Sequence, residues 1–224
     1  MVPVQNIKDL LGSIPPGIKL IAVSKTRTCE EIMEIYQSGH KIFGENRVQE
    51  LTDKYRQLPQ DIEWHMVGHL QTNKVRYITP FVHLIHSADS LKLLQVINSE
   101  AVKCNRIIDC LLEIHIAREE SKFGLKREEL EWIIRSGEIS HLHNTRITGL
   151  MGMASFTGDE QLIRSEFRTL RQIFEEIRKH NYLPAEQFKE LSMGMSGDYK
   201  IAIEEGSTMV RIGTLIFGER MTGT

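Results

Sequence analysis

The chain has 224 residues, 41% of them hydrophobic and 26% charged, with a formal net charge of −2 at pH 7. This composition is typical of a globular protein, and the balanced charge gives no electrostatic footprint for nucleic acid. No apolar run approaches the roughly 20 residues that span a bilayer, and the N-terminus lacks a basic segment followed by an apolar one, so neither a membrane span nor a secretory signal is indicated. The three cysteines (Cys29, Cys104, Cys110) have neither metal nor redox spacing, so we expect reduced thiols and a cytoplasmic location.

Short apolar runs alternate with longer amphipathic segments along the chain. After a first helix at 4–12, the predicted strands are residues 18–25, 40–46, 62–68, 82–88, 106–116, 146–153, 188–194 and 208–218. Helical patterns follow the first seven strands, at 29–39, 47–58, 71–80, 90–104, 126–137, 159–180 and 198–206. Such alternation predicts a parallel sheet with helical crossovers. Eight units favour a (β/α)₈ TIM barrel with an extra N-terminal helix, as one domain over residues 1–224, rather than an open doubly wound sheet.

Two glycine-containing segments lie at the ends of the last two predicted strands. They are "SMGMSGD" (192–198) and "RIGT" (211–214). Glycine lets a backbone approach a ligand closely, and unpaired N–H groups at the start of a helix attract anions. Because the loops after strands seven and eight are the recurrent phosphate site of this barrel, the two segments predict a phosphate cradle. Ordinary glycine turns are the alternative.

Lys25 ends the first predicted strand, within "LIAVSKTRT" (20–28). Most lysines at such positions extend into water. The alternative is a nucleophilic amine, with a pKa lowered by desolvation and by cations such as Arg27 and Arg211, that forms a Schiff base with a carbonyl. A ligand with both an aldehyde and a phosphate would engage Lys25 and the cradle together, and pyridoxal 5′-phosphate (PLP) is such a ligand.

Seven segments carry a family resemblance. In chain order they are "AVSKT", "FGENRVQE", "WHMVGHLQTNK", "EESKFG", "GLMGM", "LSMGMSGD" and "GSTMVRIGTLIFGER". With them the chain resembles the pyridoxal phosphate homeostasis protein family, the single-domain relatives of the barrel half of alanine racemase. The resemblance implies a barrel with covalently bound PLP. The cofactor-binding residues that it implies are Lys25 (Schiff base), Asn46 (near the ring), Arg211 (facing the pyridine nitrogen), and Ser196, Gly213 and Thr214 (at the phosphate).

Three further positions bear on this resemblance. Lys122, in "ESKFG", matches a lysine close to the site in the family. Thr28 stands where many relatives carry proline, which alters only a loop start. Arg47 replaces an aromatic residue of some relatives, which leaves the local cofactor contacts open. The family implies a role in intracellular vitamin B6 homeostasis, with PLP-requiring apoenzymes as candidate partners and no nucleic-acid or membrane partner.

The resemblance leaves the choice between carrier and enzyme open. An arginine at the pyridine nitrogen cannot accept a proton, so it would weaken the electron sink on which PLP chemistry depends. Racemisation also needs a base on each face of the substrate. None of the five tyrosines lies at a predicted strand end. Because the sequence stops four residues past Arg220, we expect no counterpart of the second domain of alanine racemase. We therefore expect a non-catalytic carrier, and no catalytic residue is assigned. The alternatives are a PLP-dependent amino-acid racemase of low activity and a cofactor-free aldolase-type barrel that uses Lys25.

Nine histidines raise the question of a metal site. His65 and His69 are four apart, but on an extended segment this spacing separates them by about 13 Å. No acidic or cysteine partner stands at ligand spacing, so no metal site is expected. His69 remains a candidate neighbour of the cofactor. Since a closed barrel leaves no strand edge unpaired, we expect a monomer.

Overall fold

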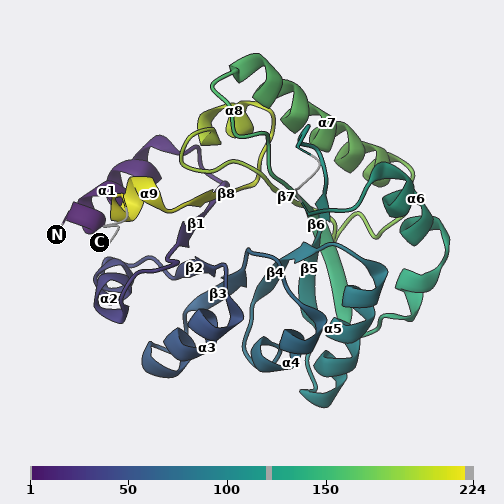
Figure 1. Cartoon of the computed structure of the whole chain (residues 1–224), viewed down its shortest axis with the longest axis horizontal. Helices are drawn as coiled ribbons and strands as arrows, with labels where there is room; N and C mark the ends of the chain where they lie inside the picture. Colours follow the sequence, from purple (N-terminus) through teal and green to yellow (C-terminus); the bar gives the residue numbers. More distant parts are fainter. Residues whose placement is uncertain (1, 120–122, 220–224) are drawn as a thin grey trace.

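A computed structural model of the chain, which describes residues 2–119 and 123–219, shows eight parallel strands that close into a barrel in the order β1 to β8 (Figure 1). The strands are β1 (Lys19–Val23), β2 (Ile42–Glu45), β3 (Glu63–Met66), β4 (Leu84–Ala88), β5 (Ile108–Ile114), β6 (Thr145–Gly152), β7 (Glu190–Ser192) and β8 (Met209–Ile212). β8 pairs with β1 from Lys19↔Met209 to Ala22↔Ile212, which closes the sheet. The (β/α)₈ barrel is therefore confirmed over the open sheet.

A helix precedes the barrel and at least one follows each strand. The helices are α1 (Val2–Ser13), α2 (Cys29–Gln37), α3 (Val48–Gln57), α4 (Val75–Ile78), α5 (Leu91–Lys103), α6 (Arg127–Arg135), α7 (Glu160–Lys179), α8 (Tyr199–Glu204) and α9 (Thr214–Phe217). Two 3₁₀ turns, η1 (Thr72–Lys74) and η2 (Glu138–His141), lie beside α4 and after α6. Among the described helices none has the length and apolar character to cross a membrane.

Side-chain caps set where several helices begin. The Thr28 hydroxyl accepts from the N–H of Glu31, and the Glu31 carboxylate accepts from the N–H of Thr28, which forms a capping box at α2. The Ser90 hydroxyl accepts from an N–H in the first turn of α5, and Asp159 accepts from two N–H groups at the start of α7. Each cap satisfies backbone donors that the helix itself leaves unpaired.

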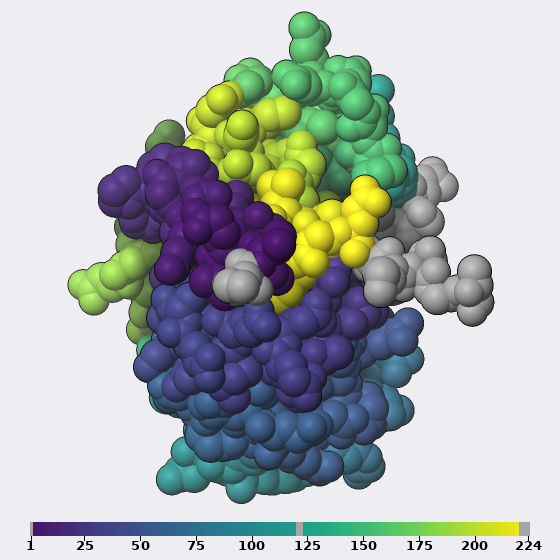
Figure 2. Space-filling view, turned by 90° about the vertical axis from the view of Figure 1, so that its left-hand side faces the viewer, coloured from purple at the N-terminus to yellow at the C-terminus, as the bar shows by residue number. Residues whose placement is uncertain are grey.

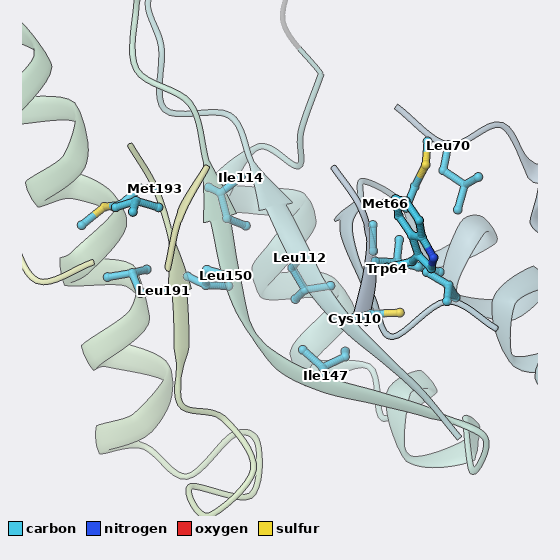
Figure 3. Close-up of a cluster of buried hydrophobic side chains, with 14 of the residues drawn as sticks. Trp64, Met66, Leu70, Cys110, Leu112, Ile114, Ile147, Leu150, Leu191 and Met193 are labelled. Carbon is cyan, nitrogen blue, oxygen red and sulfur yellow. The ribbon is translucent and has the colours of Figure 1, made fainter. Parts of the chain in front are cut away.

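The strands separate two apolar layers, because their side chains alternate between the two faces of the sheet. The larger layer lies between strands and helices, where Leu112, Leu150 and Leu191 contribute from β5, β6 and β7 (Figure 3). The smaller layer fills the barrel interior and consists of Ile21, Val67, Leu84, Leu111, Met151 and Met209.

The two ends of the described chain lie side by side. α1 packs against α9, and the Asn6 side chain donates to the carbonyl oxygen of Ile216 at 3.0 Å. Figure 2 shows the N-terminal segment, in purple, against the C-terminal segment, in yellow. The extra N-terminal helix is therefore confirmed, and it is anchored to the last β/α unit.

Most predicted strand boundaries differ from the structure by one or two residues, and two differences bear on the site. The sequence predicts the eighth strand over 208–218, but it ends at Ile212, and residues 214–217 form α9. Ile216 and Phe217 of this short helix are buried while Leu215 is 41% exposed, and four residues are too few to show a helical period. The first strand ends at Val23, which places Lys25 in the following turn.

Candidate functional site

A cavity of about 370 Å³ opens at the C-terminal ends of the strands. All six residues predicted to bind the cofactor line it: Lys25, Asn46, Ser196, Arg211, Gly213 and Thr214. They come from the ends of β1, β2, β7 and β8, which are neighbours in the closed barrel although they span about 190 residues of sequence. Barrel closure is therefore what brings the predicted site together.

A buried ion pair supports the turn that carries Lys25. The Nζ of Lys54, on α3, donates to the carbonyl oxygen of Ser24 and to Oε1 of Glu45, each at 2.7 Å. The Ser24 hydroxyl donates to the same Glu45 oxygen at 2.6 Å. Lys25 itself is half-buried, and Thr26 after it has φ 66°, in the left-handed region that a β-branched residue rarely adopts. The backbone on both sides of Lys25 is therefore held by specific contacts.

Burial dominates the electrostatics of Glu45. Desolvation raises the pKa of this carboxyl to about 7, although the Lys54 ammonium and the Ser24 hydroxyl both act to lower it. Its second oxygen, Oε2, has no hydrogen-bond partner among the described residues. Glu50 completes the cluster, because its Oε1 accepts from Lys54 at 2.7 Å and from the N–H of Thr26. Sequence reasoning missed Lys54 and Glu50, the two members of this cluster on α3, since charged residues of an amphipathic helix usually face water.

The turn after β7 presents unpaired backbone donors to the cavity. Asp198 closes the turn, because its Oδ1 accepts from the N–H of Met195 at 2.5 Å and its own N–H donates to the Met195 carbonyl at 3.1 Å. The N–H groups of Ser196 and Gly197, between these two residues, donate to no acceptor among the described residues. Both residues line the cavity, so the turn offers donors to an anion.

The turn after β8 adds two more donors. The N–H groups of Gly213 and Thr214 likewise have no acceptor within the described chain. A Cβ at position 213 would lie 3.0 Å from the carbonyl oxygen of Val23, which is tighter than ordinary contacts and accounts for the glycine. Four N–H groups without an acceptor among the described residues and the hydroxyls of Ser196 and Thr214 therefore belong to the cavity lining, and this donor set fits a phosphate group.

Arg211 forms part of the cavity lining from inside the barrel. Its Nη1 donates to the carbonyl oxygen of Ser192 at 2.9 Å and to the Ser192 hydroxyl at 2.6 Å, and its Nη2 donates to the carbonyl of Gly152 at 3.1 Å. Burial lowers its pKa to about 10, against the opposing carboxylates of Asp198 and Glu113. The guanidinium therefore stays a cation near neutral pH and has no capacity to accept a proton.

The loop after β6 supplies lining residues that the sequence did not indicate as a group. Ser155, Phe156 and Thr157 line the cavity, together with Met153 at the strand end. The Ser155 hydroxyl and N–H each donate to the buried carboxylate of Glu166, on α7, at 2.7 Å. The motif "GLMGM" (149–153) indicated that the end of β6 belongs to the site. The loop after it shows no sequence pattern that predicts contact with a ligand.

Arg27, one of the two cations expected to lower the pKa of Lys25, forms its contacts outside the cavity. Its guanidinium donates to the carbonyl oxygen of Gly218 and to Glu31, and lies 5.6 Å from the centroid of the Phe217 ring. It does not line the cavity. The cation next to the turn of Lys25 is therefore Lys54 and not Arg27, because the Lys54 ammonium donates to the carbonyl oxygen of Ser24.

His69 and Arg47 line a neighbouring groove of about 440 Å³, which shares Asn46 with the cavity. The His69 ring stacks on Phe123, with centroids 4.0 Å apart. His69 is therefore adjacent to the cavity but not part of its lining. The other candidate neighbour, Lys122, lies outside the described residues.

The comparisons with known proteins agree with this geometry. The model of the family "Alanine racemase, N-terminal domain" matches residues 4–221. A pyridoxal phosphate homeostasis protein of Aquifex aeolicus is 44% identical over 205 residues, which cover 90% of this chain and 87% of that protein. The human protein of the same name is 38% identical over 224 residues, and the match covers 94% of this chain and 78% of that protein.

Solved structures extend the likeness from sequence to fold. PipY of Synechococcus elongatus, solved with PLP bound, is 33% identical, has a TM-score of 0.87, and the match covers 96% of this chain and 100% of that chain. The same protein without PLP gives a TM-score of 0.90 at 32% identity, over 97% of this chain and 100% of that chain. Sequence and fold therefore agree over nearly the whole length, and the chain belongs to the pyridoxal phosphate homeostasis protein family.

Proposed function

We infer that the chain binds PLP in this cavity as a Schiff base on Lys25 and serves in intracellular vitamin B6 homeostasis. One observation carries the inference: a single cavity brings the Lys25 side chain together with four backbone N–H groups that have no acceptor among the described residues. PipY, a relative with the same fold, has been solved with PLP.

Each part of the site has a distinct task in this proposal. When bound, PLP supplies an aldehyde that condenses with an amine, with loss of one water, and a phosphate dianion. Lys25 provides the amine, and its turn is held by Lys54 and Glu45. Ser196 and Gly213 contribute donors to the phosphate, and Arg211 is the buried cation toward the pyridine nitrogen.

The site favours holding the cofactor over turning over a substrate. Among the described lining residues the only carboxylate is Asp198, and its Oδ1 already accepts from the Met195 N–H. The Arg211 guanidinium stays charged at neutral pH, so it does not transfer a proton to the pyridine nitrogen and cannot accept one from it. We therefore propose a carrier that binds PLP and releases it to PLP-requiring apoenzymes. The second candidate is a racemase of low activity, because the matching family model is named for a domain of alanine racemase.

Borohydride reduction followed by peptide mass mapping tests the covalent link. The purified protein should be yellow, and reduction should leave a pyridoxyl group on Lys25 that is lost in Lys25→Ala and retained in the control Lys41→Ala. A pyridoxyl group on another lysine would overturn the assignment. Colourless protein that does not take up added PLP would instead support the aldolase-type alternative.

Two further measurements separate the remaining possibilities. Ser196→Ala should retain PLP more weakly than the parent protein while its thermal unfolding stays unchanged, because it removes a donor and no packing. Incubation of the PLP-loaded protein with amino acids in deuterated water should show no α-deuterium exchange at turnover-like rates. Such exchange would overturn the carrier and favour a PLP-dependent enzyme, of which the racemase is the candidate.

A further inference from the structure

The N-terminal mouth of the barrel, opposite the Lys25 cavity, holds three side chains of metal-ligating type. Glu63 and His65 are two residues apart on β3 and therefore share one face of the sheet. His83 comes just before β4, where the β3–β4 register pairs His65 with Leu84. One ligand atom from each of Glu63, His65 and His83 lies within 4.8 Å of the other two. All three line a cavity of about 270 Å³.

His65 provides the independent evidence for a ligand. The side chain is 2% exposed, and its Nε2 has no hydrogen-bond partner among the described residues. Its other ring nitrogen, Nδ1, lies 2.9 Å from Nε2 of His86. A histidine that binds a metal usually forms a hydrogen bond through its second nitrogen, which fixes the ring and its tautomer. His65 shows this arrangement, with Nε2 remaining for the ion.

The charges around the cavity leave Glu63 available. The Lys19 ammonium is bound by Glu190 at 2.6 Å, and the Arg146 guanidinium is bound by Asp109 through two contacts of 2.6 and 2.8 Å. Over the described lining residues, carboxylates outnumber lysine and arginine cations by four to three. The cavity therefore does not repel a cation.

We propose that Glu63, His65 and His83 bind a divalent transition-metal ion of the Zn²⁺ class, with water in the fourth position. Two imidazole nitrogens and one carboxylate oxygen with an open position are a ligand set that such ions adopt. Ca²⁺ and Mg²⁺, which prefer oxygen ligands, are disfavoured by the two histidines.

Binding requires a modest closure of the cluster. Metal–ligand bonds of about 2.0–2.1 Å set tetrahedral ligand atoms roughly 3.3 Å apart, whereas Nε2 of His83 and Oε2 of Glu63 are now 3.6 Å apart. The His83 ring lies parallel to the His65 ring at 5.5 Å and must turn to present its nitrogen. Glu63 and His83 have side chains that are 46% and 53% exposed, so they move at little cost, while buried His65 stays fixed.

This site could not be found by spacing along the chain. The expectation of no metal site considered His65 with His69, its neighbour in sequence. The candidate ligands instead meet across two adjacent strands, and Glu63 and His83 are 20 positions apart. Only the strand register brings them together.

Calorimetric titration of the chelator-treated, full-length protein with Zn²⁺ tests the proposal. The parent protein should bind one equivalent at this cluster, and Co²⁺ in place of Zn²⁺ should give the visible absorption of a four-coordinate ion. His83→Ala and Glu63→Gln should each weaken this binding by at least about tenfold. Both side chains are exposed, so both variants should fold, which circular dichroism checks. His143→Ala removes another exposed histidine and should leave the affinity unchanged.

Two outcomes would overturn the proposal. One is a parent protein that takes up no Zn²⁺ at a stoichiometric site. The other is an affinity that His83→Ala and Glu63→Gln leave at the parent value, because the ion would then be held by other histidines or cysteines. Neither outcome depends on whether Lys25 carries PLP.

Discussion

At the scale of single residues, the buried pair of Lys54 and Glu45 lies directly behind the turn of Lys25. Lys54 is 5% exposed and Glu45 is fully buried. Lys54→Met should lower the free energy of unfolding by about 3–5 kcal/mol at pH 8, because it leaves the Glu45 carboxylate buried without its cation. Urea unfolding measures this change. The loss should be smaller at pH 5, where Glu45 is protonated since its pKa is about 7.

The matched control is the Lys41–Asp61 pair, whose side chains are about half exposed. Lys41→Met should lower the free energy of unfolding far less than Lys54→Met does, because water screens this exposed pair. Equal losses in the two variants would show that the buried cluster does not have the role assigned to it.

Glu113 is a second buried carboxyl, and unlike Glu45 it shares the interior face of its strand with Leu111. Burial, with a further contribution from Asp89, raises its pKa to about 7 although Arg211 acts to lower it. Between about pH 4.5 and 7 the folded protein therefore holds a proton that the unfolded chain releases, so folding becomes less favourable as the pH rises through this window. Glu113→Gln carries no such proton.

The free energy of unfolding of Glu113→Gln, relative to the parent protein, should therefore rise between pH 5 and pH 8 by up to about 3 kcal/mol. Urea unfolding at both pH values checks this, with Glu186→Gln, at an exposed position, as the control. A relative stability that does not change with pH would contradict the assigned role of Glu113.

At the scale of elements, the junction of β6 and β7 is a tight part of the barrel wall. Gly149 pairs with Glu190, and a Cβ on Gly149 would lie 1.7 Å from the Glu190 carbonyl oxygen. Both groups belong to paired strands and cannot yield as a flexible side chain would. Gly149→Ala should therefore destabilise the protein by about 3 kcal/mol or more.

Gly158 gives the comparison for this prediction. A Cβ there meets no atom within 4 Å, so Gly158→Ala should change the free energy of unfolding by no more than about 0.5 kcal/mol. Chemical denaturation of the two variants measures both. A mild Gly149→Ala variant would mean that β6 and β7 can separate without loss of the fold.

At the scale of the whole molecule, closure determines how the chain meets other chains. Every strand of the barrel has a neighbour on both sides, so the wall offers no free edge for strand pairing. We therefore expect a monomer. Light scattering coupled to size-exclusion chromatography should give the mass of one chain across a wide concentration range, and a constant mass of two chains would refute this expectation.

The barrel was predictable because the pattern of a strand followed by a helix repeats eight times. Uncertainty about one strand–helix unit does not change the predicted architecture. Lys25, Ser196 and Arg211 were predictable as one site because strand ends converge in a barrel. The helical turn after Gly213 was not predictable, since four residues show no period. The cluster around Glu45 was not predictable either, because a pattern of charges does not reveal which of them are buried.

Four buried polar side chains inside the barrel, those of His65, His86, Ser192 and Arg211, are linked to one another. From His65, contacts of 2.9 Å lead to His86 and on to the Ser192 hydroxyl, which also accepts from Arg211. Each neutral ring carries a single hydrogen, so the tautomer of one ring dictates that of the other. The group that contacts Nε2 of His65 thereby decides whether the Ser192 hydroxyl accepts from Nδ1 of His86 or donates to it. His65, His86, Ser192 and Arg211 therefore form one chain of contacts through the barrel with two proton arrangements, and we expect a ligand on Nε2 of His65 to select the one in which the Ser192 hydroxyl accepts from both His86 and Arg211.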